Sequence, residues 1–392
     1  MKNGQNNMLA LAIVSVLVGM TSAVGAEPVD LGRSDLDIDV ETESSEYSFD
    51  DVFGGCGFDV EDINGNYDAS VDVSAIGDAI IRTDSRTYDD AYDCAFGFAV
   101  GDITVGVSGY ETPDAIVEKT EDSSGNIKVE GGLQENLTEG VDARMTYSFF
   151  SDRPVVRVLY TLSNTTSADI AESVYIGGNY GSDGSTTLEA TFSGQLNPDT
   201  EELDIYSNDL WYMTSDDDSS DPILTLTTHG SYADVVPVNI MKPMDGSDDF
   251  LLQYSVVIPA GESIIIMIFS EMTAYDKGFD LGIESATQSA ADFESLETLE
   301  RAGLLEGMSE ESLASLVNYA RLEGGGAEEE EVVEEEAEVV EEGGGVAEET
   351  EELTPETPAD DNVSSGGSSS GGALSFPLLL IGGLLAFRRK RA

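Results

Sequence analysis

Histidine, cysteine and tryptophan are scarce in this chain of 392 residues, which holds one histidine, two cysteines and one tryptophan. A zinc site draws on several histidine or thiolate ligands, so this composition excludes zinc. Histidine-based catalysis has one candidate, His229, and no Gly-x-Ser-x-Gly motif accompanies it. A hydroxyl nucleophile would need an oriented base, and Ser231 alone lies nearby in the sequence. We therefore favour a turn position for His229.

Basic residues are also scarce, because the chain has 17 Lys and Arg against 78 Asp and Glu. Residues 27–322 hold 60 acidic and 12 basic side chains, a balance of −48. Such a surface repels nucleic acid and anionic lipid, which excludes both as partners. The acidity fits either cation binding or solubility in salty water, where repulsion between carboxylates is screened. We favour solubility.

Residues 1–26 read as a secretory signal peptide. Lys2 supplies the positive charge, an apolar core follows from Met8 to Met20, and small residues precede a cleavage site after Ala26;. The mature chain would begin at Glu27, and we expect it to be exported.

The C-terminal residues 364–392 form an ordered series of a Gly/Ser run, an apolar segment at 373–387 and a basic cluster. An apolar helix of 15 residues spans about 22 Å, less than the roughly 30 Å of a hydrocarbon core. Pro377 and Gly382 weaken this helix further;. The residues expected to direct sorting and processing are Gly366, Gly367, Gly371, Gly372, Arg388, Arg389, Lys390 and Arg391.

This order of features resembles the GlyGly-CTERM sorting signal of Gram-negative bacteria. The resemblance implies cleavage by a rhombosortase, a rhomboid-type membrane protease, and export by a type II secretion system. It also implies transient residence in the inner membrane through the tail, followed by attachment at the cell surface. The alternative is an ordinary single-pass anchor that is never cut.

The two cysteines, Cys56 and Cys94, are expected to form a disulfide, because an exported chain meets an oxidising environment;. Closing this loop would stabilise the fold by about 4 kcal/mol in the chain-entropy account. A metal site built from two cysteines and one histidine is the rival interpretation, and export disfavours it.

The body, residues 27–283, alternates apolar and polar residues at the strand period, with Gly, Asp, Asn or Ser between the runs;. The pattern predicts an all-β fold, a large antiparallel, supersandwich-like β-sandwich, with two tandem sandwiches as the alternative. Hairpins are expected at 145–163 and 250–270, and a short strand at 203–205. The unbroken apolar run at 264–269 predicts a central strand that is covered on both faces.

Two short helices are expected to close the domain within residues 284–322. Ala286, Ala290 and Phe293 begin an apolar stripe at helical spacing, and Ser309 is a good N-cap for a second helix that continues to Ala320;. Residues 323–363 are rich in Glu and contain no basic residue, which predicts a disordered acidic stalk;.

The body also resembles a β-sandwich domain of exported bacterial proteins to which no catalytic residue is assigned. The residues that carry this resemblance are Ala91-Tyr92-Asp93, Asn179-Tyr180-Gly181-Ser182-Asp183-Gly184, Ser215-Asp216-Asp217 with Asp221-Pro222, Ile258-Pro259-Ala260-Gly261-Glu262 and the closing helix after Gly307. The chain departs from that pattern at Cys94, where the pattern has glycine, which fits an added disulfide with Cys56.

Calcium is the best local candidate for metal binding. Asp62, Asn64, Asn66 and Asp68 place oxygen ligands at alternate positions of a turn, which suits a hard cation;. The turn lacks the glycine and the final glutamate of an EF-hand loop, so a solvated turn without an ion is favoured over structural calcium. No other cofactor is expected.

Trp211 and Tyr212 could stack on a glycan or other surface ligand, although a core position between strands is the favoured interpretation. Two carboxylates about 5–10 Å apart suffice for glycoside hydrolysis, so the many acids leave this chemistry open without locating it. No nucleophile–base motif is present, and we therefore expect a surface-displayed, non-catalytic binding or adhesive module. A carbohydrate-active enzyme that uses paired carboxylates is the alternative.

Overall fold

The computed structural model describes residues 38–49, 56–61, 68–73, 75–110, 118–181, 186–198, 200–216, 221–241 and 248–321. The chain divides into two compact units, Met1–Glu328 and Glu329–Ala392, and every described residue belongs to the first. The predicted signal peptide, stalk and sorting tail lie outside the described residues.

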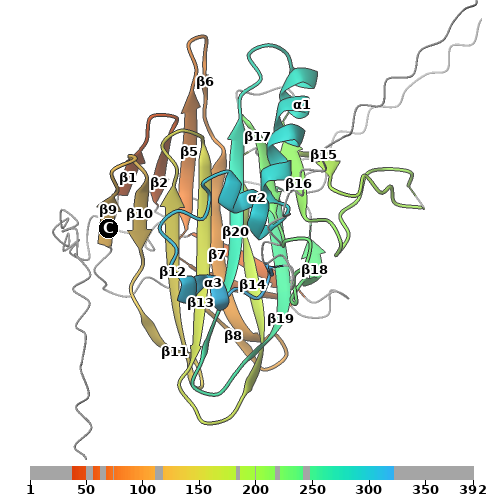
Figure 1. Ribbon diagram of the computed structural model, residues 1–392. Helices are drawn as coiled ribbons and strands as arrows, with labels where there is room; N and C mark the ends of the chain where they lie inside the picture. The colour runs from red at the N-terminus through yellow and green to blue at the C-terminus, as the bar shows by residue number, and fades with distance from the viewer. Residues whose placement is uncertain are drawn as a thin grey trace, which may run out of the picture. The chain divides into compact units, whose positions relative to one another are not determined.

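The described unit is built on two nine-stranded sheets (Figure 1). The strand order of the first sheet is β1-β2-β5-β7-β14-β19-β18, with β6 beside β5 and β8 beside β7. Its strands are β1 (Ile38–Glu41), β2 (Ser45–Phe49), β5 (Ile76–Arg82), β6 (Thr87–Tyr88), β7 (Tyr92–Asp102), β8 (Gly106–Gly109), β14 (Ile170–Tyr180), β18 (Pro237–Met241) and β19 (Asp249–Ile258).

The second sheet has the order β15-β16-β17-β20-β13-β12-β10-β9, with β11 beside β12. Its strands are β9 (Glu118–Glu121), β10 (Ile127–Glu130), β11 (Gln134–Thr138), β12 (Val141–Phe149), β13 (Val155–Asn164), β15 (Thr187–Thr191), β16 (Trp211–Ser215), β17 (Ile223–Thr227) and β20 (Ser263–Thr273). The named strand pairs of both sheets are antiparallel, as the sequence predicts.

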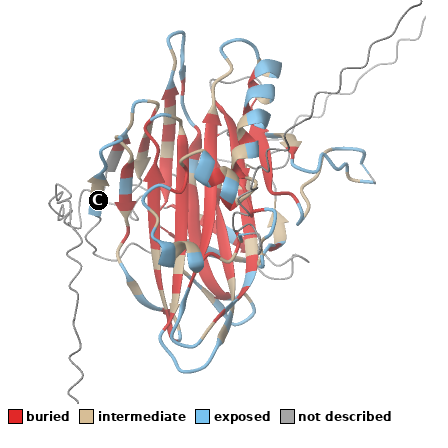
Figure 2. Ribbon diagram, viewed as in Figure 1, coloured by how far each residue is buried: buried red, intermediate tan, exposed pale blue. Residues whose placement is uncertain are grey.

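The core lies between the two sheets. Phe98, Ile176 and Tyr254 face inward from the first sheet, and Tyr160 and Ile266 face inward from the second. These side chains are fully buried, and Figure 2 shows that buried residues occupy the middle of the strands. Alternation of apolar and polar residues therefore produces one large antiparallel β-sandwich, and the prediction of the fold class is confirmed.

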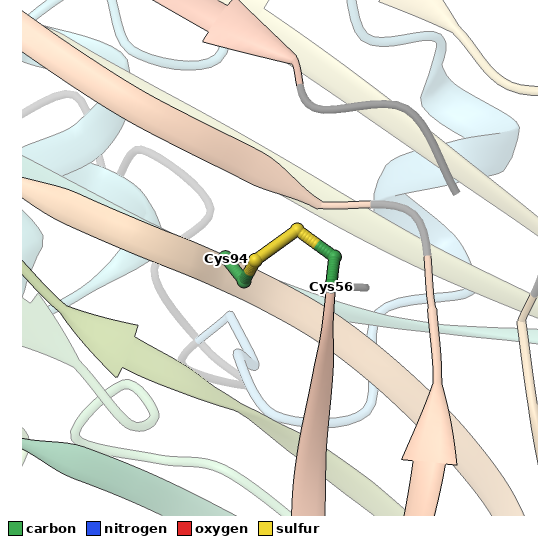
Figure 3. Close-up of a disulfide and its surroundings, with 2 residues drawn as sticks. All are labelled: Cys56 and Cys94. Carbon is green, nitrogen blue, oxygen red and sulfur yellow. A yellow bond between two sulfur atoms is a disulfide. The ribbon is translucent and has the colours of Figure 1, made fainter. Parts of the chain in front are cut away.

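The outer face of the first sheet is partly covered by a separate hairpin, β3 (Gly57–Glu61) and β4 (Asp68–Asp72). Phe58 of this hairpin packs over Gly97 and Gly177, and a Cβ at Gly177 would lie 2.6 Å from the Phe58 ring. The two glycines thus provide the space that this ring occupies. The predicted disulfide is confirmed: Cys56 and Cys94 are bonded, with Cα atoms 5.2 Å apart, and tie the hairpin to β7 (Figure 3).

Helices cover part of the outer face of the second sheet. They are α1 (Phe279–Ala290), the 3₁₀ turn η2 (Ala291–Phe293), α2 (Leu296–Arg301) and α3 (Glu310–Ala314). Phe293 and Leu299 pack against Met267 and Phe269, which point outward from β20. This strand is buried on both faces along most of its length, which confirms the central strand expected at 264–269.

The last helix ends earlier than the sequence predicts. Ser309 caps α3 as expected, its hydroxyl accepting a hydrogen bond from the Ser312 amide, but the helix stops at Ala314. Leu316 then forms a parallel bridge with Ile265, at a part of β20 that β17 does not cover. The free amides and carbonyls of that strand edge need partners, and the extended segment supplies them in place of another helical turn.

One predicted hairpin is wrong. Residues 250–270 do not pair with each other, because β19 pairs with β14 and β18 whereas β20 pairs with β13 and β17. The connection at 259–262 passes from one sheet to the other, and Asn164 fixes it by donating to the carbonyl of Ile258. The other predicted hairpin is confirmed by the pairing of β12 with β13. The strand expected at 203–205 is reduced to a single bridge between Leu203 and Leu196.

Candidate functional site

A groove of about 530 Å³, lined by both polar and apolar side chains, lies on the outer face of the second sheet. Its floor consists of the outward-facing side chains of β10, β12 and β13, and its rim includes Glu306, Gly307, Met308 and Ser312 at and before α3. The volume falls within the range of small-molecule sites. The charged and hydroxyl side chains of the floor, together with Leu159, face outward because the alternate residues of the same strands fill the core;.

The strand register arranges the floor in rows. Lys128 of β10, Ser148 of β12 and Arg157 of β13 are directly opposite one another. In the next row Glu130 lies opposite Thr146. Cβ atoms of directly opposed residues lie about 4.5–5.5 Å apart, so each row presents its functional groups close together. Thr161 and Ser163 extend the hydroxyl-lined surface along β13.

Two cations hold Glu130 ionised at the edge of the groove. Its carboxylate accepts from Lys128 Nζ at 2.7 Å and is also paired with Arg144. Burial alone would raise the pKa of Glu130, but the hydrogen bonds and charges of Lys128 and Arg144 outweigh burial and lower it;. Both basic side chains remain partly exposed, at 48% for Lys128 and 40% for Arg144.

Arg157 is a buried cation in the floor, with 3% of its surface exposed. Its Nη1 donates to the carbonyl of Leu304 at 2.6 Å, and its Nη2 donates to the Glu306 carbonyl and to Ser148 Oγ, each at 3.0 Å. Among the residues described, no carboxylate forms an ion pair with it. Burial lowers the pKa of Arg157 to about 10, so the guanidinium stays charged at neutral pH.

The groove has little aromatic surface. Phe150 is the aromatic residue in its lining, and that side chain is buried. Leu133 is the exposed apolar residue of the lining, at 43%. Ligand recognition here would therefore depend on hydrogen bonds and charge, because no exposed aromatic face of the lining is available for stacking.

The suggestion that Trp211 and Tyr212 stack on a ligand is wrong, and the favoured interpretation as core residues is correct. Trp211 is 5% exposed and packs beside Phe192, at a ring-centroid distance of 6.1 Å. Tyr212 is fully buried, and its hydroxyl is hydrogen-bonded to that of Tyr180 at 3.0 Å. Neither ring presents a face to solvent.

His229 lies two residues after the end of β17 and is 5% exposed. Its Nδ1 lies 2.9 Å from Thr228 Oγ1, and burial lowers its pKa to about 4 although Asp209 opposes this shift. Ser231 is engaged elsewhere, because its hydroxyl donates to the Glu294 carbonyl. The two residues therefore do not form a nucleophile–base pair.

The proposed calcium turn and the sorting signal are beyond what the structure describes. Asp62, Asn64 and Asn66 lie outside the described residues, and Asp68 begins β4. Gly366, Gly367, Gly371, Gly372, Arg388, Arg389, Lys390 and Arg391 also lie outside them. In the part of the chain that is described, no three His, Cys, Asp or Glu side chains come together as a metal site. Within the same part, no helix is both long and apolar enough to cross a membrane.

The groove residues Lys128, Ser148 and Arg157 were not singled out from the sequence. They are dispersed along the chain, and only the register of β10, β12 and β13 brings them together. A weak signal was present, since Arg157 interrupts the apolar run from Val155 to Leu159 in a chain with few basic residues.

The sequence matches no known protein family and no curated protein. Similar solved structures include a protein described as a kojibiose phosphorylase from the human microbiome, at 9% identity and a TM-score of 0.36 over 71% of this chain. This chain spans 36% of the length of that protein.

Two further structures are of the galactose mutarotase kind. A galactose mutarotase related enzyme from Lactobacillus acidophilus shares 8% identity over 61% of this chain and 97% of its own, with a TM-score of 0.32. A galactose mutarotase-like protein from Lactobacillus casei shares 13% identity over 55% and 99%, with a TM-score of 0.30. With every score below 0.5, these similarities carry no argument about the ligand or activity of this chain.

Proposed function

We propose that this protein is an exported, non-catalytic surface module that binds a polyhydroxylated ligand such as a glycan in the groove of the second sheet. The observation that carries the proposal is the hydroxyl-lined floor beside a paired, ionised carboxylate. Thr146, Ser148, Thr161 and Ser163 line two neighbouring strands. A hydroxyl both donates and accepts hydrogen bonds, which matches the hydroxyls of a sugar.

The lowered pKa of Glu130 favours ligand binding over glycoside hydrolysis as the function of the groove. A general acid must be protonated near neutral pH, which requires a raised pKa, whereas that of Glu130 is lowered;. Burial raises the pKa of Glu271, but this residue is hydrogen-bonded to Arg153 beside α1 and is not part of the groove lining. A carbohydrate-active enzyme that uses paired carboxylates is the competing function.

A glycan array combined with turnover assays on the bound polysaccharides separates these two functions. We expect binding without turnover, and we expect Glu130→Gln to weaken binding of neutral glycans, because an amide oxygen accepts hydrogen bonds from sugar hydroxyls less strongly than a carboxylate does. Glu135→Gln changes an exposed carboxylate of β11 and serves as the matched control. Turnover of a bound glycan that Glu130→Gln abolishes would establish the enzyme instead.

Export and display form the second part of the proposal and are supported by the two terminal signals of the sequence. The partners would be a rhomboid-type sorting protease and the type II secretion machinery, with the membrane contacted through the tail before processing. Intact-mass spectrometry of surface-released protein tests this part. A chain that starts at Glu27 and ends within Gly366–Gly372 is expected, whereas a mass that retains Arg388–Ala392 would leave a plain anchor.

A further inference from the structure

We infer that one end of the groove is an anion subsite, so that the ligand is a sugar with a single anionic group, a carboxylate or a phosphate. The subsite is the row formed by Lys128, Ser148 and Arg157. This inference rests on the proposed function, because it names the class of ligand that the same groove would take.

The geometry of the row places one hydroxyl between two cations. Ser148 is paired with Lys128 on one side and with Arg157 on the other. Adjacent strands lie about 4.8 Å apart, so an oxyanion bound at the Ser148 hydroxyl would lie within reach of Lys128. Lys128 donates one hydrogen bond to Glu130, and an ammonium group has two further N–H donors;.

Arg157 makes Ser148 a donor to the ligand. Ser148 Oγ accepts from Arg157 Nη2, which leaves the serine proton to be donated. Hydrogen bonds in a chain polarise one another, so a hydroxyl that accepts from a guanidinium donates more strongly. The charge of Arg157 is not neutralised by a described carboxylate, and an incoming anion would compensate it;.

The charge of the whole body limits the ligand to a single anionic group. Residues 27–322 carry a balance of −48, which repels a polyanion at every point along its length;. A single carboxylate or phosphate on a neutral sugar interacts mainly with the nearby row, because more distant charges are screened beyond about 8 Å at physiological ionic strength.

The test measures the affinity of the full protein for a panel of uronic acids, the matching neutral hexoses and their 6-phosphates. NMR titration reports both affinity and the residues that respond. We expect at least one anionic sugar to bind about tenfold more tightly than its neutral counterpart. The carboxylate and phosphate arms identify which oxyanion is preferred.

Ser148→Ala is the decisive variant, because it removes the donor while Arg157 keeps both backbone carbonyl partners. We expect it to abolish most of the preference for the anionic sugar, whereas the neutral sugar, which also uses the other hydroxyls of the floor, loses affinity by a smaller factor. Ser163→Ala removes a hydroxyl elsewhere in the lining and is the control, with the preference retained.

Two results would overturn the inference and are distinguishable. Equal affinity for anionic and neutral sugars, with no effect of Ser148→Ala on their ratio, rejects the anion subsite and leaves the binding function standing. Absence of any response of groove residues to every sugar in the panel rejects the binding function together with the subsite.

Discussion

Asn318 joins the end of the described chain to the middle of the second sheet. Its Oδ1 accepts from the Met267 amide at 2.9 Å, and its Nδ2 donates to the carbonyls of Met267 and Thr228. The residue is fully buried. At an uncovered strand edge, the backbone amide and carbonyl of the same residue both lack partners. A side-chain amide can pair with both of them.

Replacing Asn318 by alanine is expected to destabilise the fold by about 3 kcal/mol, because the amide and the carbonyl of Met267 would lose their partner in a buried site;. The Thr228 carbonyl keeps the hydrogen bond from the Tyr254 hydroxyl. Urea denaturation measures the change. Asn208→Ala alters an exposed asparagine and should stay within about 0.5 kcal/mol of the parent;. Equal stability of the two variants would contradict the role assigned to Asn318.

Because the pKa of His229 is lowered in the fold, we expect the stability of the protein to depend on pH through this residue. Its pKa is about 4 in the fold and about 6.5 when unfolded, so the unfolded chain binds more protons between these values;. Stability from this residue is therefore fully present above pH 6.5 and is lost as the pH falls toward 4, by at most about 3 kcal/mol.

The variant His229→Gln isolates this contribution, because the chain has one histidine. The free energy of unfolding should fall less between pH 7.5 and pH 4.5 in the variant than in the parent. Other titratable groups, such as Glu271, whose pKa burial raises, contribute equally to both proteins. Parallel pH profiles would show that His229 is not buried in its neutral form.

At the scale of elements, the β3–β4 hairpin depends on a covalent link as well as on packing. Phe58 and Val60 are buried against Tyr175 and Leu251 of the first sheet, and the disulfide fixes the start of β3 on β7. The hairpin contributes no strand to either nine-stranded sheet, since β3 and β4 pair only with each other among the described residues.

The double variant Cys56→Ala, Cys94→Ala is expected to lose about 4 kcal/mol, and a melting temperature roughly 10 °C lower follows for a domain of this size. Differential scanning calorimetry measures the shift. A reducing agent should lower the melting temperature of the parent and leave that of the double variant unchanged. A parent that melts at the same temperature with and without reductant would contradict the stabilising role of the disulfide.

The elements also show how far the sequence predicts the fold. The strand period, the buried run of β20 and the cap of α3 are local signals, and each is confirmed. The sequence of residues 250–270 predicts a hairpin. The residues Pro259 to Glu262 can form a turn either between two strands of one sheet or between strands of two different sheets, and their sequence does not distinguish the two cases. The distinguishing feature is burial: β19 is exposed at Ser255 and Val257, whereas β20 is covered on both faces.

The candidate site was less predictable than the fold. Trp211 is the one tryptophan of the chain, but the rarity of a residue does not distinguish a ring in the core from a ring that binds a ligand. Lys128 and Arg157 belong to no recognisable sequence motif. Strand register brings them together, and register depends on contacts between distant parts of the chain. Register of this kind is decided by packing across the sandwich and not by local propensity.

In the molecule as a whole, several of the few basic side chains pair with carboxylates or line the groove. Arg153 joins Glu271 to Asp292 beside α1, and Lys128, Arg144 and Arg157 line the groove. The remaining surface is acidic, which favours solubility and discourages association between copies of the chain. The groove is therefore a region of locally balanced charge on a strongly negative protein.

Blocking each outer face of the sandwich in turn shows whether the glycan binds in the groove. Thr161→Trp places a large ring in the floor of the groove, whereas Ser255→Trp places the same ring on an exposed position of β19 in the first sheet. Calorimetric titration with the glycan found by array should show at least tenfold weaker binding for Thr161→Trp and unchanged binding for Ser255→Trp. Unchanged binding in Thr161→Trp would contradict the groove as the binding site.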